Sequence, residues 1–171
     1  EVNTNGEVYT KLTSDNSTVS TDTTTDVENI IGGAGDDIFR SNSSDNSFNG
    51  MGGVDTLNLS DKTVAMTVNV AAGTVSGDGA DTITSVENFI GGSGSDTFIA
   101  KDEAVANSFD GGTSTSGGNG DTVSYQAYSS GVKVDLAISG GQTVKTGDVD
   151  TLIGIENLTG SGYIDTLKGD N

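Results

Sequence analysis

Gly32-Gly33-Ala34-Gly35-Asp36-Asp37-Ile38-Phe39-Arg40 combines a glycine-rich run, an acidic pair and an apolar residue within nine positions. Glycine tolerates positive φ, so such a run forms a tight turn that can aim several backbone carbonyls at one point. The acid adds carboxylate oxygens, and the apolar residue two positions later is expected to turn inward and pack. The stretch therefore predicts an oxygen-lined turn followed by a very short strand.

The same unit recurs along the chain. An acid or asparagine stands two residues before an apolar residue at positions 28, 37, 46 and 55, which are nine residues apart, and all five phenylalanines follow this rule. A longer period is set by Asp22, Asp81 and Asp150, which are separated by 59 and then 69 residues. Repeats of this kind bury one side chain per rung against their neighbours. We predict one continuous stack, divided into an atypical or frayed first rung (1–26), a first superrepeat (27–85), a second superrepeat (86–154) and the start of a third, truncated one (155–171).

The net charge of the chain limits the kinds of partner that it can bind. It contains 25 Asp and Glu residues against seven Lys and Arg, a formal net charge of −18. This excess of negative charge argues against a nucleic-acid partner and against binding to an anionic membrane surface. It also argues against insertion into a membrane. Stacked turns would hold carboxylates about 5 Å apart, where repulsion costs roughly 3 kcal/mol per pair at an effective dielectric constant near 20. Cations must offset this repulsion, because the six lysines and Arg40 are few and scattered.

The absence of cysteine and histidine selects the kind of cation. Zinc sites, disulfides and most nucleophile–base catalysis are excluded, and the remaining oxygen ligands suit Ca²⁺. A disulfide-free chain that uses calcium fits an extracellular or bacterial cell-surface location better than a cytosol. No signal peptide or membrane-spanning run is visible, and the chain opens and closes within the repeat pattern, so we expect it to be a segment of a longer protein with flanking repeats.

The remaining stretches predict strands. Met66, Val68 and Val70 alternate with polar residues, as do Val132 and Val134, which is the period of a strand with one buried face. No window has helical periodicity, and 26 glycines disfavour helices. The fold class is therefore all-β.

Calcium takes six to eight oxygen ligands, so one turn is too small a site and a second must complete it. If alternate turns lie on the same edge of a flattened coil, partners are 18 residues apart. The turn ending at Asp37 and the turn ending at Asp55 have this spacing, and they form the strongest candidate site.

The pattern Gly-Gly-x-Gly-x-Asp-x-apolar-x, matched by 32–40 and nearly matched by 50–57 and 91–98, resembles the calcium repeat of the RTX (repeats-in-toxin, haemolysin-type) family. The resemblance implies a right-handed parallel β-roll, a β-solenoid with calcium between stacked turns, assembled outside the cell after type I secretion. It covers about half of the chain, and the strand-rich stretches between the calcium turns are expected to form wider β-helical rungs without metal.

Two further sites follow. The turn 91–96 should pair with 117–121 across an insertion, and Asp165 would need a partner beyond Asn171. Glu28, Glu87 and Glu156 lack preceding glycines and are expected to accept hydrogen bonds from neighbouring backbone amides. The predicted metal-binding residues are Gly32, Gly33, Gly35, Asp37, Gly50, Gly52, Gly53, Asp55, Gly91, Gly92, Gly94, Asp96, Gly117, Gly118, Asp121 and Asp165.

Three alternatives remain. The first is an enzyme, because many lyases and epimerases use parallel β-helices. Their active sites need basic side chains close to acidic ones, so no enzyme is predicted. A cleft with one lysine and two metal-free carboxylates would argue for an enzyme. A glycan- or ice-binding module is the second, since threonines occupy the outward position before the apolar residue at 56, 82, 97, 122, 151 and 166. Tyr125 and Tyr128 are the best aromatic candidates for stacking on a sugar. An EF-hand at 148–156 fails the required spacing.

The sequence thus predicts a structural calcium-binding segment of a secreted or surface bacterial protein, such as an adhesin, that folds when it meets calcium after export.

Overall fold

The computed structural model describes residues 2–3, 7–11, 18–23, 28–113 and 120–170. Within these ranges the chain forms strands, turns and bends without any helix, which confirms the all-β class. Consequently, no helix in the described part of the chain is long and apolar enough to span a membrane. The strands are β1 (Val2–Asn3), β2 (Glu7–Lys11), β3 (Thr18–Thr23), β4 (Asn29–Ile31), β5 (Ile38–Arg40), β6 (Ser47–Asn49), β7 (Thr56–Asn58), β8 (Thr67–Asn69), β9 (Thr74–Ser76), β10 (Ala80–Thr84), β11 (Asn88–Ile90), β12 (Thr97–Ile99), β13 (Asn107–Asp110), β14 (Thr122–Ser124), β15 (Lys133–Asp135), β16 (Gln142–Lys145), β17 (Asp148–Ile153), β18 (Asn157–Thr159) and β19 (Thr166–Lys168).

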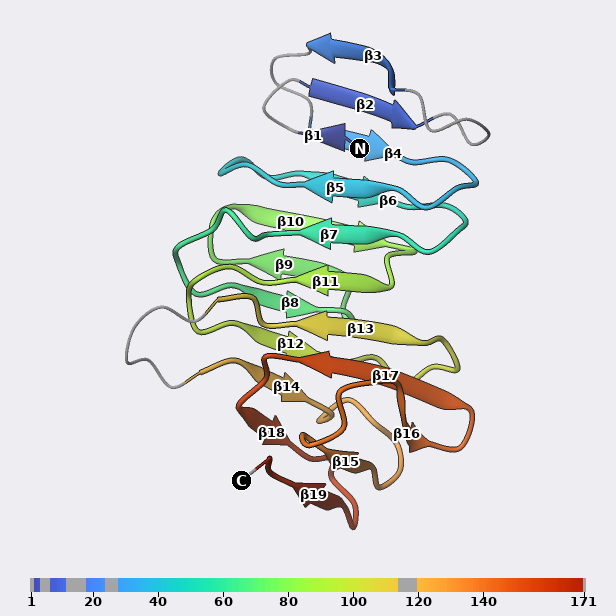
Figure 1. Cartoon of the computed structure of the whole chain (residues 1–171), viewed down its shortest axis with the longest axis vertical. Coiled ribbons are helices and arrows are strands. Elements are labelled where there is room, and N and C mark those ends of the chain that lie inside the picture. The colour runs from blue at the N-terminus through green and yellow to red at the C-terminus, as the bar shows by residue number, and fades with distance from the viewer. Residues whose placement is uncertain (1, 4–6, 12–17, 24–27, 114–119, 171) are drawn as a thin grey trace.

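Most strands belong to two sheets that face each other along the length of the molecule (Figure 1). Sheet A has the order β16-β17-β13-β11-β7-β5-β1-β2-β3, and sheet B has the order β18-β14-β12-β8-β9-β10-β6-β4. A separate pair, β15 and β19, lies at the C-terminal end. The chain passes repeatedly from one sheet to the other, so sequence neighbours such as β4 and β5 lie in different sheets.

Strands that follow each other within a sheet are mostly parallel and in register. Asn29 pairs with Ser47 in sheet B, and Ile38 pairs with Thr56 in sheet A, each an offset of 18 residues. This is the predicted offset for one full circuit. Three-residue strands such as β6, β7 and β12 bury their central residue and direct the first and last residues outward, as the alternation of a β-strand requires. This burial is lost at the C-terminal end, where Leu167 in the middle of β19 is 41% exposed.

The core is a single column of these central side chains. Phe39 and Phe109 of sheet A and Phe48 and Phe98 of sheet B are at most 1% exposed. Their rings meet across the two sheets, with centroids 5.5 Å apart for Phe39 and Phe48 and 5.6 Å apart for Phe98 and Phe109. The prediction that the apolar residue of each unit turns inward is confirmed for all five phenylalanines, which are buried.

Turns connect the sheets at two edges. At the first edge the chain passes from sheet B to sheet A, as in the turns 32–37 and 50–55. At the second edge it returns from sheet A to sheet B, as in the turns 41–46 and 91–96. Alternate turns therefore lie on the same edge, which is the arrangement that the 18-residue spacing predicts.

The strand-rich stretches differ from the predicted wider parallel rungs. β8, β9 and β10 form an antiparallel meander within sheet B, and β16 and β17 form an antiparallel hairpin at the end of sheet A. Glycines with positive φ permit the reversals: Gly73 has a φ of 69° before β9, and Gly147 has a φ of 85° between β16 and β17. The inward positions are nevertheless as predicted, because Met66, Val68 and Val70 are all buried.

Some predicted features lie outside the described residues. These are several residues of the predicted first rung, including 24–26, and two of the candidate metal-binding glycines, Gly117 and Gly118.

Candidate metal-binding turns

The first stack of turns occupies the first edge and consists of 32–37, 50–55 and 85–87. The backbone N–H of Asp37 donates to Oδ1 of Asp55 at 2.8 Å, and the N–H of Asp55 donates to Oε2 of Glu87 at 2.9 Å. The N–H of Gly52 also donates to the carbonyl of Gly33 at 3.2 Å. The predicted facing of the Asp37 and Asp55 turns is therefore observed, and Glu87 adds a third level to it.

The second stack lies at the second edge and repeats this order with 91–96, the described parts of 111–121, and 154–156. The N–H of Asp96 donates to Oδ1 of Asp121 at 2.6 Å, and the N–H of Asp121 donates to Oε2 of Glu156 at 2.7 Å. The predicted approach of Asp96 and Asp121 is thus observed. The described glycine opposite Gly91 is Gly111, whose carbonyl closely approaches the Gly91 Cα. The sequence signal for it was the pair Gly111-Gly112.

Carboxylate and carbonyl oxygens converge at the first glycine of each glycine-rich turn in both stacks. A Cβ atom there would lie within 3.0 Å of the turn's own aspartate Oδ2 and of the carbonyl oxygen of the corresponding residue in the next turn. Only glycine leaves this space free, because any side chain would displace backbone. The four positions, each with its two oxygens, are Gly32 (Asp37 Oδ2, Gly50 O), Gly50 (Asp55 Oδ2, Ser85 O), Gly91 (Asp96 Oδ2, Gly111 O) and Gly111 (Asp121 Oδ2, Gly154 O).

Asp55 is the member of this set with an unsatisfied oxygen. Gly33 and Gly92, each second in its turn, donate their N–H groups to Oδ2 of Asp37 and Asp96 at 2.7 and 2.8 Å. Met51 holds that place before Asp55, but its N–H donates to Oδ1 of Asn49 at 3.1 Å instead. Oδ2 of Asp55 is consequently buried without a hydrogen-bond partner. Met51 also has a φ of 72°, which is strained for a bulky residue, so the turn holds the backbone of Met51 in an unfavourable conformation.

Burial makes these carboxylates costly in their charged form. Asp55 and Asp96 are each 1% exposed. Loss of solvation raises the pKa of both carboxyl groups, and it outweighs the backbone N–H groups of Asp37 on Asp55 and of Met66 on Asp96, which act in the opposite direction. Repulsion from Asp37 raises the pKa of Asp55 further, and repulsion from Asp121 does the same for Asp96. A positive charge at either position would relieve both effects.

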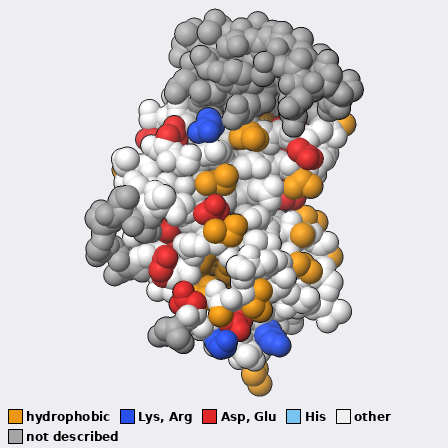
Figure 2. Space-filling model, viewed as in Figure 1, with side chains coloured by type: hydrophobic (Ala, Val, Ile, Leu, Met, Phe, Trp, Pro, Cys, Tyr) orange, Lys and Arg blue, Asp and Glu red, His pale blue; other side chains and the backbone are white. Residues whose placement is uncertain are grey.

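Lysine side chains form ion pairs outside the two stacks of turns. Within the described part of the chain, lysines pair with Asp78, Asp102, Glu103 and Asp135, all of which lie outside the two stacks. In Figure 2 the coloured part of this face carries acidic side chains along its length, with basic ones toward the two ends of that coloured part. Within residues 28–113 and 120–170, no three acidic side chains gather into a metal site by themselves. Any cation in the stacks must therefore take backbone carbonyl oxygens as well.

The other predicted glycines serve the stacking of the turns. Gly53, with a φ of 120°, packs against the carbonyl of Gly35, and Gly94 packs against the backbone of Val64. Gly92 lies against the carbonyl of Lys62. A Cβ at Gly52 would meet nothing within 4 Å, so Gly52 has no steric reason to be glycine.

Asp165 lies in a third place and faces a segment earlier in the chain. Its Oδ1 accepts the N–H of Val132 at 2.9 Å, and its Oδ2 accepts the N–H of Ser161 at 2.9 Å. The turn 160–165 therefore stacks on 131–132, a contact that the sequence did not predict. Hydrogen bonds from the Val132 and Ser161 groups lower the pKa of this half-buried carboxyl. Asp165 is thus stabilised as an anion without a cation.

Glu87 and Glu156 accept backbone N–H groups, as predicted, and each closes a stack. The residue two positions before each glutamate adopts positive φ: Ser85 has a φ of 50° and Gly154 a φ of 58°. Ser85 is therefore a non-glycine residue at a place where the other stack has glycine. For Glu28, the contact seen is through its backbone carbonyl, which accepts the N–H of Ser47.

The predicted threonine face is divided between sheets. Thr56 and Thr151 lie in sheet A, Thr166 lies on β19, and Thr82, Thr97 and Thr122 lie in sheet B. Of the six, Thr97 and Thr122 pair directly, and Thr67 extends this row by one strand. The six residues therefore do not form a single flat array.

Tyr125 and Tyr128 are buried, so they cannot stack on a sugar at the surface. Tyr125 donates its hydroxyl to Oδ2 of Asp150 at 3.1 Å, and Tyr128 donates to Oδ2 of Asp148 at 2.7 Å. Both aspartates are 0% exposed, and their side chains point inward from alternate positions of β17. Burial, followed by repulsion from Asp148, raises the pKa of Asp150 to about 7.

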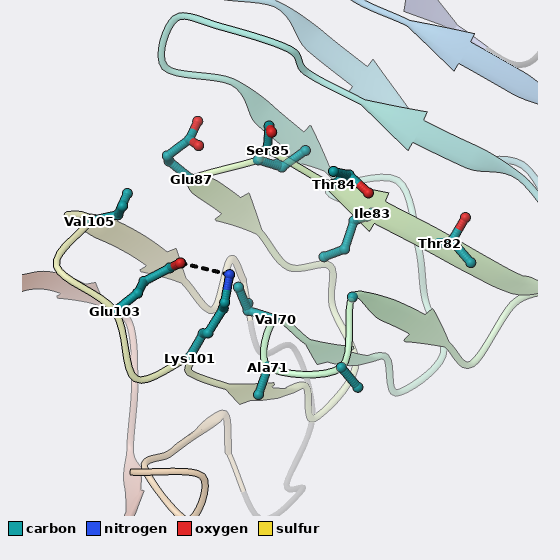
Figure 3. A pocket seen from close by; sticks show the side chains of 13 residues that line it. Val70, Ala71, Thr82, Ile83, Thr84, Ser85, Glu87, Lys101, Glu103 and Val105 are labelled. Carbon is teal, nitrogen blue, oxygen red and sulfur yellow. Dashed lines mark ion pairs between the residues drawn. The ribbon is translucent and has the colours of Figure 1, made fainter. Parts of the chain in front are cut away.

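A groove at the first edge contains Glu87, Lys101 and Glu103, the combination that would favour an enzyme (Figure 3). Glu103 forms an ion pair with Lys101 at 2.7 Å, while the Glu87 carboxylate points away from this pair and is hydrogen-bonded to the turn above. The two carboxylates therefore do not converge with the lysine on one reacting position, which the geometry of acid–base catalysis requires.

No protein-family model matches this chain, and no curated protein matches it either.

Proposed function

We propose that this chain is a calcium-binding β-solenoid segment, a right-handed parallel β-roll interrupted by antiparallel insertions, with a structural rather than a catalytic role. The observation that carries the proposal is the convergence of a carboxylate oxygen and a carbonyl oxygen at Gly32, Gly50, Gly91 and Gly111. Two acceptor oxygens repel each other unless a donor or a cation lies between them. At Gly50 the carboxylate oxygen has no donor.

The residues present fit calcium better than other metals. The ligands are carboxylate and carbonyl oxygens, without nitrogen or sulfur, and calcium accepts such a mixed set in flexible geometry. In the first stack Asp37, Asp55 and the carbonyls of Gly50 and Ser85 would hold the ion, and in the second stack Asp96, Asp121 and the carbonyls of Gly111 and Gly154 would do so. A bound ion would supply the positive charge that these buried carboxylates lack.

Binding of calcium and folding are coupled in this proposal. In the unfolded chain the acids are hydrated and far apart, whereas the stacks bury Asp55, Asp96 and Asp121. Burying them without a cation costs free energy, so calcium stabilises the folded state by mass action. An affinity of about 10⁻⁴ to 10⁻³ M, typical of extracellular modules, would make folding respond to the calcium outside a cell.

This response suits a secreted or surface protein, and we propose that the chain is an adhesin-like segment assembled after export by a type I system. Its neighbours in such a protein would be flanking repeats that continue the same stacks. The net charge of −18 would keep the chain expanded wherever calcium is scarce.

Calcium titration of the 171-residue chain, followed by circular dichroism and by hydrodynamic radius, tests the proposal. Strand signal and compaction should appear together as calcium rises, and magnesium at the same concentrations should be much less effective, because it demands stricter octahedral geometry. A chain that keeps its compact β structure in excess chelator would refute the proposal.

A further inference from the structure

The two sheets differ in strand number next to the first stack, and this difference opens the groove at the first edge. In sheet A, β11 and β13 are direct neighbours, whereas β9 and β8 separate β10 from β12 in sheet B. Neighbouring strands lie about 4.8 Å apart. The connections from β10 to β11 and from β12 to β13 therefore lie close together where they enter sheet A and farther apart where they leave sheet B. The β8–β9 turn lies in the resulting wedge and leaves a cavity of about 530 Å³.

The groove has an apolar base and polar walls (Figure 3). Val70, Ile83 and Val86 line it as largely buried side chains. Exposed residues with hydroxyl groups come from β10 and the residue that follows it, and charged groups come from the connection between β12 and β13 on the opposite side. The polar lining residues are Thr82, Thr84, Ser85, Glu87, Lys101 and Glu103.

Ser85 is the strained member of this lining. Its φ of 50° falls in the left-handed region, which is energetically unfavourable for any residue other than glycine. The corresponding residue of the second stack, Gly154, avoids that cost. Ser85 therefore keeps a strained backbone at the rim of the groove, and strain of this kind clusters at binding sites.

The charges of the groove restrict its ligand. Lys101 and Glu103 form an ion pair at 2.7 Å and remain 49% and 24% exposed, so an ammonium donor and a carboxylate acceptor stand side by side at the surface. Vicinal hydroxyl groups of a sugar can accept from the one and donate to the other. Anionic ligands are disfavoured, because Glu87 adds a second carboxylate and the whole chain is acidic.

We propose that this groove binds a neutral hexopyranose unit of a carbohydrate, with its C–H face on Val70, Ile83 and Val86 and its hydroxyl groups on Lys101 and Glu103. The cavity volume lies in the range of small-molecule sites, and mixed apolar and polar lining is characteristic of them. The proposal goes beyond the calcium role. Of the lining residues only Ser85 also belongs to a proposed calcium site, and there through its backbone carbonyl.

Amide NMR titration of the calcium-saturated chain with methyl α-glucoside, methyl α-mannoside and methyl α-galactoside tests the site. At least one should shift the amides of residues 70–73, 82–87 and 101–105 with a Kd of about 10⁻³ M, a typical value for a ligand of this size. Glucuronate should bind at least about tenfold more weakly because of the surrounding negative charge. Failure of all three glycosides, or equal binding of glucuronate, would overturn the proposal.

Two variants locate the binding. Lys101→Ala removes the ammonium donor and Glu103→Ala removes the carboxylate acceptor, so both should weaken glycoside binding at least about tenfold. Lys133→Ala, which changes an exposed lysine of β15 outside the groove lining, is the matched control and should leave the Kd unchanged. If all three variants bind alike, or if spermidine shifts the groove amides while the glycosides do not, the groove is not a sugar site. The amide spectrum outside the groove reports folding, so loss of the calcium-dependent fold is distinguished from loss of the sugar site.

Discussion

The backbone N–H of Asp37 donates to the Asp55 carboxylate across 18 residues of sequence, at 2.8 Å. One oxygen of Asp55 thereby joins two successive rungs, while the other lies buried beside the Ser85 carbonyl without a donor. The same side chain stabilises the stack through Oδ1 and strains it through Oδ2. A cation changes the balance between these two effects.

Asp55→Asn should therefore have opposite effects with and without calcium. In chelator, where the parent chain is expanded, an amide N–H₂ facing Ser85 O would replace two repelling acceptors by a hydrogen bond, so the variant should show as much strand signal as the parent chain or more. With calcium, the lost carboxylate should raise the midpoint of the folding titration about tenfold, equivalent to about 1.4 kcal/mol. Circular dichroism under both conditions measures this. Asp61→Asn, in an exposed turn, is the control and should shift neither value; a shift equal to that of Asp55→Asn would contradict the assigned site.

Met51→Gly should stabilise the chain. The substitution removes a bulky residue from a φ of 72°, which relieves about 1 kcal/mol of strain, although the flexible glycine costs part of this gain in the unfolded state. It also restores the glycine found before Asp37 and Asp96, whose N–H donates to the aspartate Oδ2. Urea denaturation gives the free energy of unfolding. Ala34→Gly in the neighbouring turn lacks a positive φ and should instead lose about 0.5–1 kcal/mol. If both variants change stability in the same direction, backbone strain at Met51 is not the cause.

The parts of this fold that obey local rules were predictable from the sequence. The inward direction of the five phenylalanines and the facing of the Asp37 and Asp55 turns both follow from a fixed spacing of nine or 18 residues. The Asp37 and Asp55 turns are separated by one circuit of the chain, and no insertion lies between them.

The parts that depend on insertions were not predictable. The β8–β9–β10 meander places Glu87 next to Asp55, 32 residues away, because the extra strands in sheet B leave sheet A uninterrupted. Spacing alone gives no sign of this. The stacking of Asp165 on Val132 has the same origin, since the β16–β17 hairpin lies between them. Repeat periodicity predicts neighbours only as far as the next insertion.

Stability should fall as the pH rises between about 4 and about 7, partly because of Asp150. Burial raises the pKa of Asp150 from 3.8 to about 7, so between these values the folded state binds a proton that the unfolded state has released. Each pKa unit of difference corresponds to about 1.4 kcal/mol. Asp150→Asn should flatten this part of the stability profile, measured by urea denaturation at a series of pH values in saturating calcium.

Asp135 is a control for that profile, because its pKa is shifted in the opposite direction. Its pKa is lowered by the hydrogen bond from Lys168, at 2.9 Å, so its contribution to stability is lost as the pH falls. Asp135→Asn should therefore affect only the acid end of the profile and leave the slope between pH 4 and 7 intact. If Asp150→Asn left this slope unchanged, Asp150 would be charged throughout the range.

Phe109 should contribute more to stability than any outward apolar residue, because it joins both sheets of the core. Its ring lies 5.8 Å from Phe89 in sheet A and 5.6 Å from Phe98 in sheet B, and it is 0% exposed. Phe109→Ala removes both contacts and leaves a cavity that neighbouring rungs cannot close, so the free energy of unfolding in saturating calcium should fall by about 3–5 kcal/mol. Ile164, which is 96% exposed, is the comparison, and Ile164→Ala should change stability by less than about 0.5 kcal/mol. Equal losses for the two variants would mean that the column of inward side chains is not what holds the sheets together.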